Sequence, residues 1–171
     1  MKKLLKSTLV ACLMICMLLG FTACGAKPLT EENIVGRYQI TQLVYTPSED
    51  NHGLNRAVSM SRADYDALVA RREAGTATAQ DEEDYTYFSS DFECVMEVRA
   101  DGTIYDYYGD DPEMLDGYWE IVDGKIEYTC ELNTLDQFTA EWDNGKIIIT
   151  WTLDRSDTFQ GTTVWTYERI D

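Results

Sequence analysis

Residues 92–153 read FECVMEVRADGTIYDYYGDDPEMLDGYWEIVDGKIEYTCELNTLDQFTAEWDNGKIIITWTL, six short segments in which apolar and polar residues alternate. Successive side chains of a β-strand point to opposite faces, so each segment predicts a strand with one buried face. Asp-Gly or Asn-Gly pairs separate several segments, at 101–102, 123–124 and 144–145. These pairs adopt the positive φ angles of tight turns. The stretch therefore predicts consecutive hairpins.

The same alternation continues on both sides of this stretch. The predicted strands cover 37–45, 92–99, 102–108, 116–122, 125–131, 135–142, 145–153 and 162–170. Eight antiparallel strands without crossover helices predict a mainly β fold, an eight-stranded antiparallel up-and-down β-barrel. A barrel of this size encloses one small ligand or a plug of side chains.

A helical insertion at about 61–88 is expected between the first and second strands. Ser61 with Asp64 and Thr78 with Asp81 have the spacing of capping boxes, which start helices at about 62–74 and 79–88. The first helix places Tyr65, Leu68 and Val69 on one face. A barrel mouth is the only large uncommitted surface for that face, so we expect these three residues to form a lid.

The N-terminus has the pattern of an export signal. Three lysines precede an apolar run from Thr8 to Leu19, which is short for a membrane span. The following Phe21-Thr22-Ala23-Cys24 resembles the lipobox of bacterial lipoproteins, with Phe21 at the usual Leu position. The resemblance implies cleavage after a signal peptide of residues 1–23 and a diacylglycerol on Cys24. The alternative is an ordinary secretory signal with an incidental cysteine.

The lipobox also implies a cellular location and a domain organisation. Cys24 would anchor the protein on the extracytoplasmic face of a bacterial cell membrane, with residues 24–32 as a tether and 33–171 as the barrel domain. Two acyl chains give stable attachment where one would be marginal.

The composition argues against several classes of function. Formal net charge is −17, with 31 acidic and 14 basic side chains. Nucleic-acid binding depends on Lys and Arg, so it is not expected. His52 is the only histidine and no Cys-x-x-Cys occurs, so neither a metal site nor another cofactor is expected. No nucleophile–base pair or matched carboxylate pair stands out, so we do not expect an enzyme. Cys94 and Cys130 could pair in an exported domain or remain buried thiols, the latter slightly favoured.

Four short motifs follow one another along the predicted strands: Gly36-Arg37-Tyr38, Asp101-Gly102-Thr103, Gly117-Tyr118-Trp119 and Asp123-Gly124. In this order they resemble lipocalins and the bacterial lipocalin-like lipoproteins of uncharacterised function. The resemblance covers about residues 33–170, and Tyr38 replaces the usual Trp. It implies that Arg169 packs over Tyr38 at the closed end of the barrel through a cation–π contact. The helical insertion is similar in position to the lid of intracellular fatty-acid-binding proteins.

Aromatic side chains on the strands are the candidate lining of a ligand cavity. The candidates are Trp119, Tyr128, Phe138, Trp142 and Trp151. Arg37, Arg99 and Lys125 fall on the outer parity or at strand ends, so a small apolar or weakly polar ligand fits better than an anion. The alternative is an envelope protein-interaction or structural module with a filled, ligand-free barrel, because strands use aromatics for packing too. A monomer is expected in either case.

Overall fold

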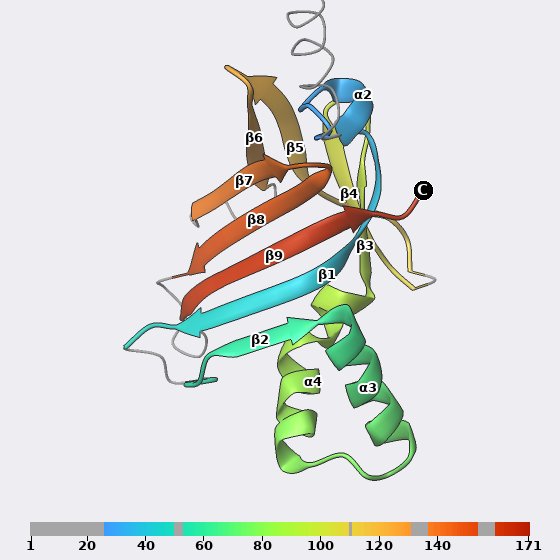
Figure 1. Ribbon diagram of the computed structural model, residues 1–171, viewed down its shortest axis with the longest axis vertical. Helices are drawn as coiled ribbons and strands as arrows, with labels where there is room; N and C mark the ends of the chain where they lie inside the picture. Colours follow the sequence, from blue (N-terminus) through green and yellow to red (C-terminus); the bar gives the residue numbers. More distant parts are fainter. Residues whose placement is uncertain (1–25, 50–52, 110, 131–136, 154–159) are drawn as a thin grey trace, which may run out of the picture.

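The computed structural model describes residues 26–49, 53–109, 111–130, 137–153 and 160–171. Its main feature is a closed, all-antiparallel barrel of eight strands (Figure 1). Each strand pairs with the next along the chain, and the last pairs with the first, which confirms the predicted fold class. The barrel strands are β1 (Gly36–Pro47), β3 (Cys94–Val98), β4 (Thr103–Tyr108), β5 (Met114–Val122), β6 (Lys125–Cys130), β7 (Gln137–Asp143), β8 (Lys146–Leu153) and β9 (Gly161–Arg169).

Two of the predicted turns have the geometry that their sequences require. Asp123 and Asn144 both have φ of 51°, and the glycines after them have φ of 74° and 94°. Asp and Asn tolerate this left-handed region better than other side chains do. The turns close the β5–β6 and β7–β8 hairpins with Val122 opposite Lys125 and Asp143 opposite Lys146.

The insertion between the first two barrel strands contains more structure than predicted. A short strand β2 (Val58–Ser61) pairs with the second half of β1, whereas β3 pairs with the first half of the same edge. Helices α3 (Arg62–Glu73) and α4 (Ala79–Glu93) follow. The predicted strand start at Phe92 was wrong, because α4 continues to Glu93 and buries Phe92 against the Tyr65 ring at 4.7 Å.

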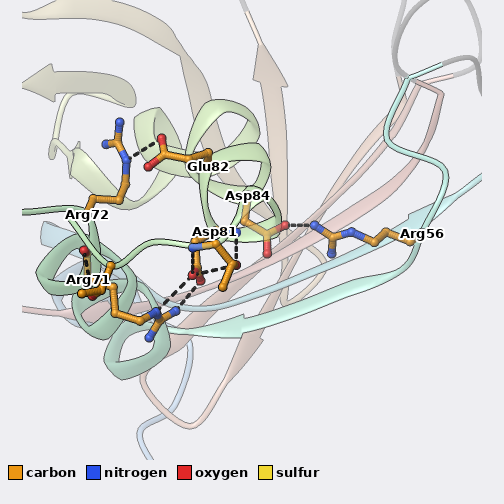
Figure 2. A network of polar contacts seen from close by, with 8 residues as sticks. Arg56, Arg71, Arg72, Asp81, Glu82 and Asp84 are labelled. Carbon is orange, nitrogen blue, oxygen red and sulfur yellow. Dashed lines mark hydrogen bonds and ion pairs between the residues drawn. The ribbon is translucent and has the colours of Figure 1, made fainter. Parts of the chain in front are cut away.

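The two helices form a hairpin fixed by caps and ion pairs (Figure 2). Both predicted capping boxes are present, Ser61 with Asp64 and Thr78 with Asp81. The Asp81 carboxylate also accepts from Arg71, so it links the last turn of α3 to the first turn of α4. Two further pairs join Arg72 to Glu82 at 3.0 Å and Arg56 to Asp84.

The opposite end of the barrel is covered by α2 (Glu31–Ile34), which spans the predicted boundary between the tether and the barrel domain (Figure 1). Ile34 is buried, and its carbonyl accepts a 2.7 Å hydrogen bond from the Tyr38 hydroxyl. Lys27 is also fixed, since its carbonyl accepts from the Trp142 indole at 2.7 Å. In the described ranges, no helix has both the length and the apolarity to cross a membrane. The predicted signal peptide and Cys24 lie outside the described residues.

Candidate functional site

The barrel interior consists of a packed half and an open half. The packed half lies next to α2, and its side chains are at most 8% exposed: Ile34, Tyr38, Met96, Val98, Ile104, Trp119, Ile126 and Ile147. The void among them measures about 10 Å³, which is no more than one water occupies. Trp119 was predicted to line a ligand cavity, but it lies in this packing, and its indole donates to the Arg99 carbonyl at 2.9 Å.

Tyr38 and Arg169 meet at this closed end. They are direct partners in the β1–β9 ladder. Burial raises the pKa of Tyr38 to about 12, and attraction to Arg169 opposes part of that rise. The guanidinium donates to Asp171 at 2.6 Å. The cation–π contacts found among the described residues do not include the expected Arg169–Tyr38 pair.

In the open half, side chains of the interior parity are only half-buried. They come from six strands and from α4: Asp91, Asp106, Tyr108, Asp116, Tyr128, Phe138, Trp151 and Tyr167. The equivalent positions in the packed half are almost fully buried. Of the two ends of the barrel, the one away from α2 is therefore the more open to solvent, which is the shape of a binding cup.

One side of the cup is a continuous row of rings, here called the aromatic wall: Tyr128, Phe138, Trp151 and Trp165, on β6, β7, β8 and β9. Adjacent ring centroids are 5.6, 5.9 and 5.7 Å apart. The row forms because these strands are neighbours and each contributes an inward residue near the same level. The Phe138, Trp151 and Trp165 rings are nearly parallel, and Tyr128 meets Phe138 edge-on.

Three carboxyl groups, here called the interior carboxyls, are electrostatic neighbours in the open half: Asp91, Asp106 and Asp116. Asp106 acts on Asp91, and Asp116 acts on Asp106. Asp91 lies near the end of α4, and Asp106 shares the inward parity of Ile104 on β4. Asp116 is the extra residue of a bulge in β5, between Leu115 opposite Tyr105 and Gly117 opposite Ile104. A bulge re-aims a side chain, and here Asp116 accepts a hydrogen bond from the Tyr128 hydroxyl.

Burial dominates the acid–base chemistry of this space. It raises the pKa of Asp91 and of Asp106 to about 7, and repulsion by a neighbouring carboxylate adds to each rise. Burial also raises the pKa of Asp116, although the Tyr128 hydrogen bond opposes it. The thiol of Cys94 likewise has its pKa raised by burial. Cys94 and Cys130 are both free and buried, as the sequence slightly favoured.

The mouth of the cup lies between α4 and the strands β8 and β9. Its pocket of about 350 Å³ is lined by Thr86, Tyr87, Phe88, Ser90, Asp91, Trp151, Thr163 and Trp165. Tyr65, Leu68 and Val69, the residues expected to form a lid, are not part of this lining. Tyr65 and Leu68 are buried and Val69 is half-buried, but Tyr65 stacks on Phe92 and Tyr85 of α4. Thus α4 borders the mouth and α3 packs against α4.

A second recess opens through the side of the barrel, between β6 and β7. Among the described residues these strands share one bridge, Ile126 with Ala140, and the groove beside it measures about 670 Å³. Tyr128 and Phe138 of the aromatic wall reach it from within, and Trp142 lines it next to the N-terminal segment. Three of the five predicted cavity residues thus lie at this groove, while Trp151 lies at the mouth.

Comparison with known proteins identifies no family for this chain. No family model, curated protein or solved structure matches the chain. The barrel is consistent with a lipocalin-like fold and compatible with ligand binding of that kind. Among the described residues, no three His, Cys, Asp or Glu side chains are grouped so that they could hold a metal ion.

The sequence analysis missed the polar members of the cup. Asp106 alternates in phase with Ile104, so its inward direction was readable from the strand pattern. The inward direction of Asp116 could not be predicted in this way. It depends on the bulge in β5, and the bulge becomes visible only when β5 is aligned with β4. Asp91 depends on where α4 ends, and that boundary was placed too early.

Proposed function

We propose that the protein is an extracytoplasmic carrier that binds a small ligand with an apolar body in the open half of its barrel. The observation that supports this most strongly is the contrast between the two halves of one interior. A barrel used only as a structural module would gain from packing both halves. This barrel instead keeps three of the four rings of the aromatic wall half-buried, beside a mouth of about 350 Å³.

The proposal includes attachment to a membrane through a lipid on Cys24. The described chain begins at residue 26, and Lys27 is bound to Trp142 and to Asn144, whose side chain accepts from the Lys27 amide at 3.0 Å. An anchor two residues before this point would attach the protein by its closed end. The mouth, at the opposite end, would then face the aqueous phase, and ligand would enter from water.

Mass spectrometry and fluorescence together test the carrier function. The full-length protein, purified from the cells that make it and kept in lipid nanodiscs, is expected to release a bound small molecule on denaturation. Added ligand should change the tryptophan emission, since Trp151 and Trp165 line the mouth. Trp151→Phe should reduce that change, whereas Trp142→Phe, at the side groove, should retain most of it. A protein that carries no small molecule and responds to none of a panel of neutral, anionic and cationic compounds is not a carrier.

A further inference from the structure

The open half of the barrel holds three carboxyl groups without a basic partner. The titratable groups that face it, from α4 and from β3 to β9, are Asp91, Cys94, Asp106, Tyr108, Asp116, Tyr128, Cys130 and Tyr167. No lysine or arginine is among the described residues that perturb the interior carboxyls. The nearby arginines are engaged outside the cup: Arg62 donates to the carbonyls of Ile40 and Phe92, and Arg99 lies over the outward Tyr105 ring.

A second feature of the same space is an indole N–H without a hydrogen bond. Trp165 is 9% exposed, and its Nε1 is the one buried side-chain N or O atom of the described residues that has no hydrogen-bond partner. It approaches the Asp91 carboxyl closely enough to lower that group's pKa somewhat, but the pair does not reach hydrogen-bond geometry. Since a buried donor is normally paired, an acceptor from a ligand is expected here.

Few ligand chemistries satisfy both features. An anion would be repelled by the interior carboxyls. A neutral apolar molecule would desolvate those groups and the Trp165 N–H without replacing their hydrogen bonds. A positively charged nitrogen would be attracted by the carboxylates and also by the faces of the aromatic wall, because aromatic rings carry negative charge above their planes. An oxygen close to that nitrogen would accept from the indole.

We propose that the ligand is a small organic ammonium that bears an oxygen acceptor, an amino alcohol or its ether, with Asp91 and Asp106 as counter-charges and Trp151 and Trp165 as the rings that contact it. This assignment rests on the carrier function proposed above and specifies its ligand class. The pocket at the mouth, about 350 Å³, is at the small end of the range for ligand sites. The matched chemistry is therefore that of a compact head group with a short apolar body.

Two matched pairs of probes test the charge directly by isothermal titration calorimetry on the full-length protein in nanodiscs made of uncharged lipid. Choline is compared with 3,3-dimethylbutan-1-ol, which has carbon in place of the charged nitrogen. Tyramine is compared with 4-ethylphenol, which lacks the amine but keeps the ring. The cation of at least one pair is expected to bind at least tenfold more tightly than its neutral partner.

Variants assign the contacts. Asp91→Asn and Asp106→Asn should each weaken the binding cation about tenfold or more and leave its neutral partner unchanged. Trp165→Phe keeps a ring but removes the N–H, so it should weaken choline several-fold and leave tetramethylammonium, which has no oxygen, unchanged. Asp111→Asn removes an exposed carboxylate outside the cup, so it should change the affinity of neither the cation nor its neutral partner. Circular dichroism checks that each variant is folded.

The outcomes separate this inference from the carrier function. If the neutral probes bind as tightly as the cations, or if an anionic compound co-purifies, the ammonium assignment is wrong while the carrier function stands. If calcium displaces choline stoichiometrically, the carboxyls serve an inorganic cation and the assignment is again wrong. If no probe of any charge binds and nothing co-purifies, the carrier function fails together with it.

Discussion

At the scale of single residues, the bulge in β5 has the largest effect on the site. Asp116 turns inward because it is the unpaired extra residue, and Gly117 follows it where β5 and β6 approach closely. A Cβ at Gly117 would lie 2.1 Å from the Thr129 carbonyl oxygen, a distance that atoms cannot share. The Asp116-Gly117 pair therefore combines an inward carboxylate with the only residue type that fits beside it.

Replacing Gly117 by alanine tests this arrangement. Gly117→Ala is expected to lower the free energy of unfolding by about 1–3 kcal/mol, the usual cost of overpacking a site that cannot expand. Urea denaturation followed by tryptophan fluorescence measures it. Tyr118→Phe, at the 45% exposed neighbour, should change stability by less than about 0.5 kcal/mol. A stable Gly117→Ala protein would mean that β5 and β6 are further apart than described.

The interior carboxyls predict an unusual dependence of stability on pH. Asp91 and Asp106 have pKa values of about 7 in the folded protein, against about 3.9 for an unfolded aspartate. Between these values the folded state binds more protons than the unfolded state, so the free energy of unfolding should fall as pH rises from about 4 to about 7. Thermal unfolding between pH 4.5 and 8 should show the melting temperature falling over that window.

Substitutions identify the groups responsible for the slope. Asp91→Asn and Asp106→Asn should each reduce the fall of the melting temperature with rising pH, and each should raise the melting temperature near pH 7.5. Asp111→Asn should leave it unchanged. Asp81 affects the pH dependence of stability in the opposite direction, because its hydrogen bond with Arg71 lowers its pKa. That carboxyl titrates below pH 4.5, so it does not contribute between pH 4.5 and 8. A melting temperature that rises steadily from pH 4.5 to 7 would show that Asp91 and Asp106 are ionised at little cost.

At the scale of elements, local signals located the helices but could not orient them. The capping boxes at Ser61 and Thr78 begin α3 and α4 where predicted, since a cap depends on residues three positions apart. The end of α4 lacks such a signal, and Phe92 could equally have begun a strand. Only the packing of Phe92 on Tyr65 decides it, and that contact spans the hairpin.

The cap of α4 can be tested by itself. The Thr78 hydroxyl accepts from the Asp81 amide at 3.1 Å, so Thr78→Ala should lower the free energy of unfolding by about 1 kcal/mol. Gln80→Ala, an exposed change in the first turn of the same helix, should have almost no effect. Chemical denaturation of both variants makes the comparison. Equal stabilities for Thr78→Ala and the parent would show that the start of α4 does not contribute to folding.

At the scale of the whole molecule, the barrel followed from alternation and turns, whereas the asymmetry of its interior did not. Two-residue periodicity predicts which side chains point inward, but it does not predict whether the space they enter is filled. Trp119 and Trp151 have the same inward parity, yet one is 7% exposed in the packed half and the other is half-buried at the mouth. The difference arises because α2 covers one end of the barrel and α4 only borders the other (Figure 1).

The membrane location of the protein is a prediction from the sequence, and one residue tests it. If Cys24 carries the diacylglycerol that the lipobox implies, radiolabelled palmitate should be incorporated into the protein, and the protein should sediment with membranes. Cys24→Ala removes the acceptor sulfur, so it should abolish the label and free the protein from the membrane fraction, because no acyl chain then holds it. Cys130→Ala, at a buried barrel thiol, is the matched control and should keep both label and location. Labelling that persists in Cys24→Ala would show that the lipid is attached elsewhere or that the signal is an ordinary secretory one.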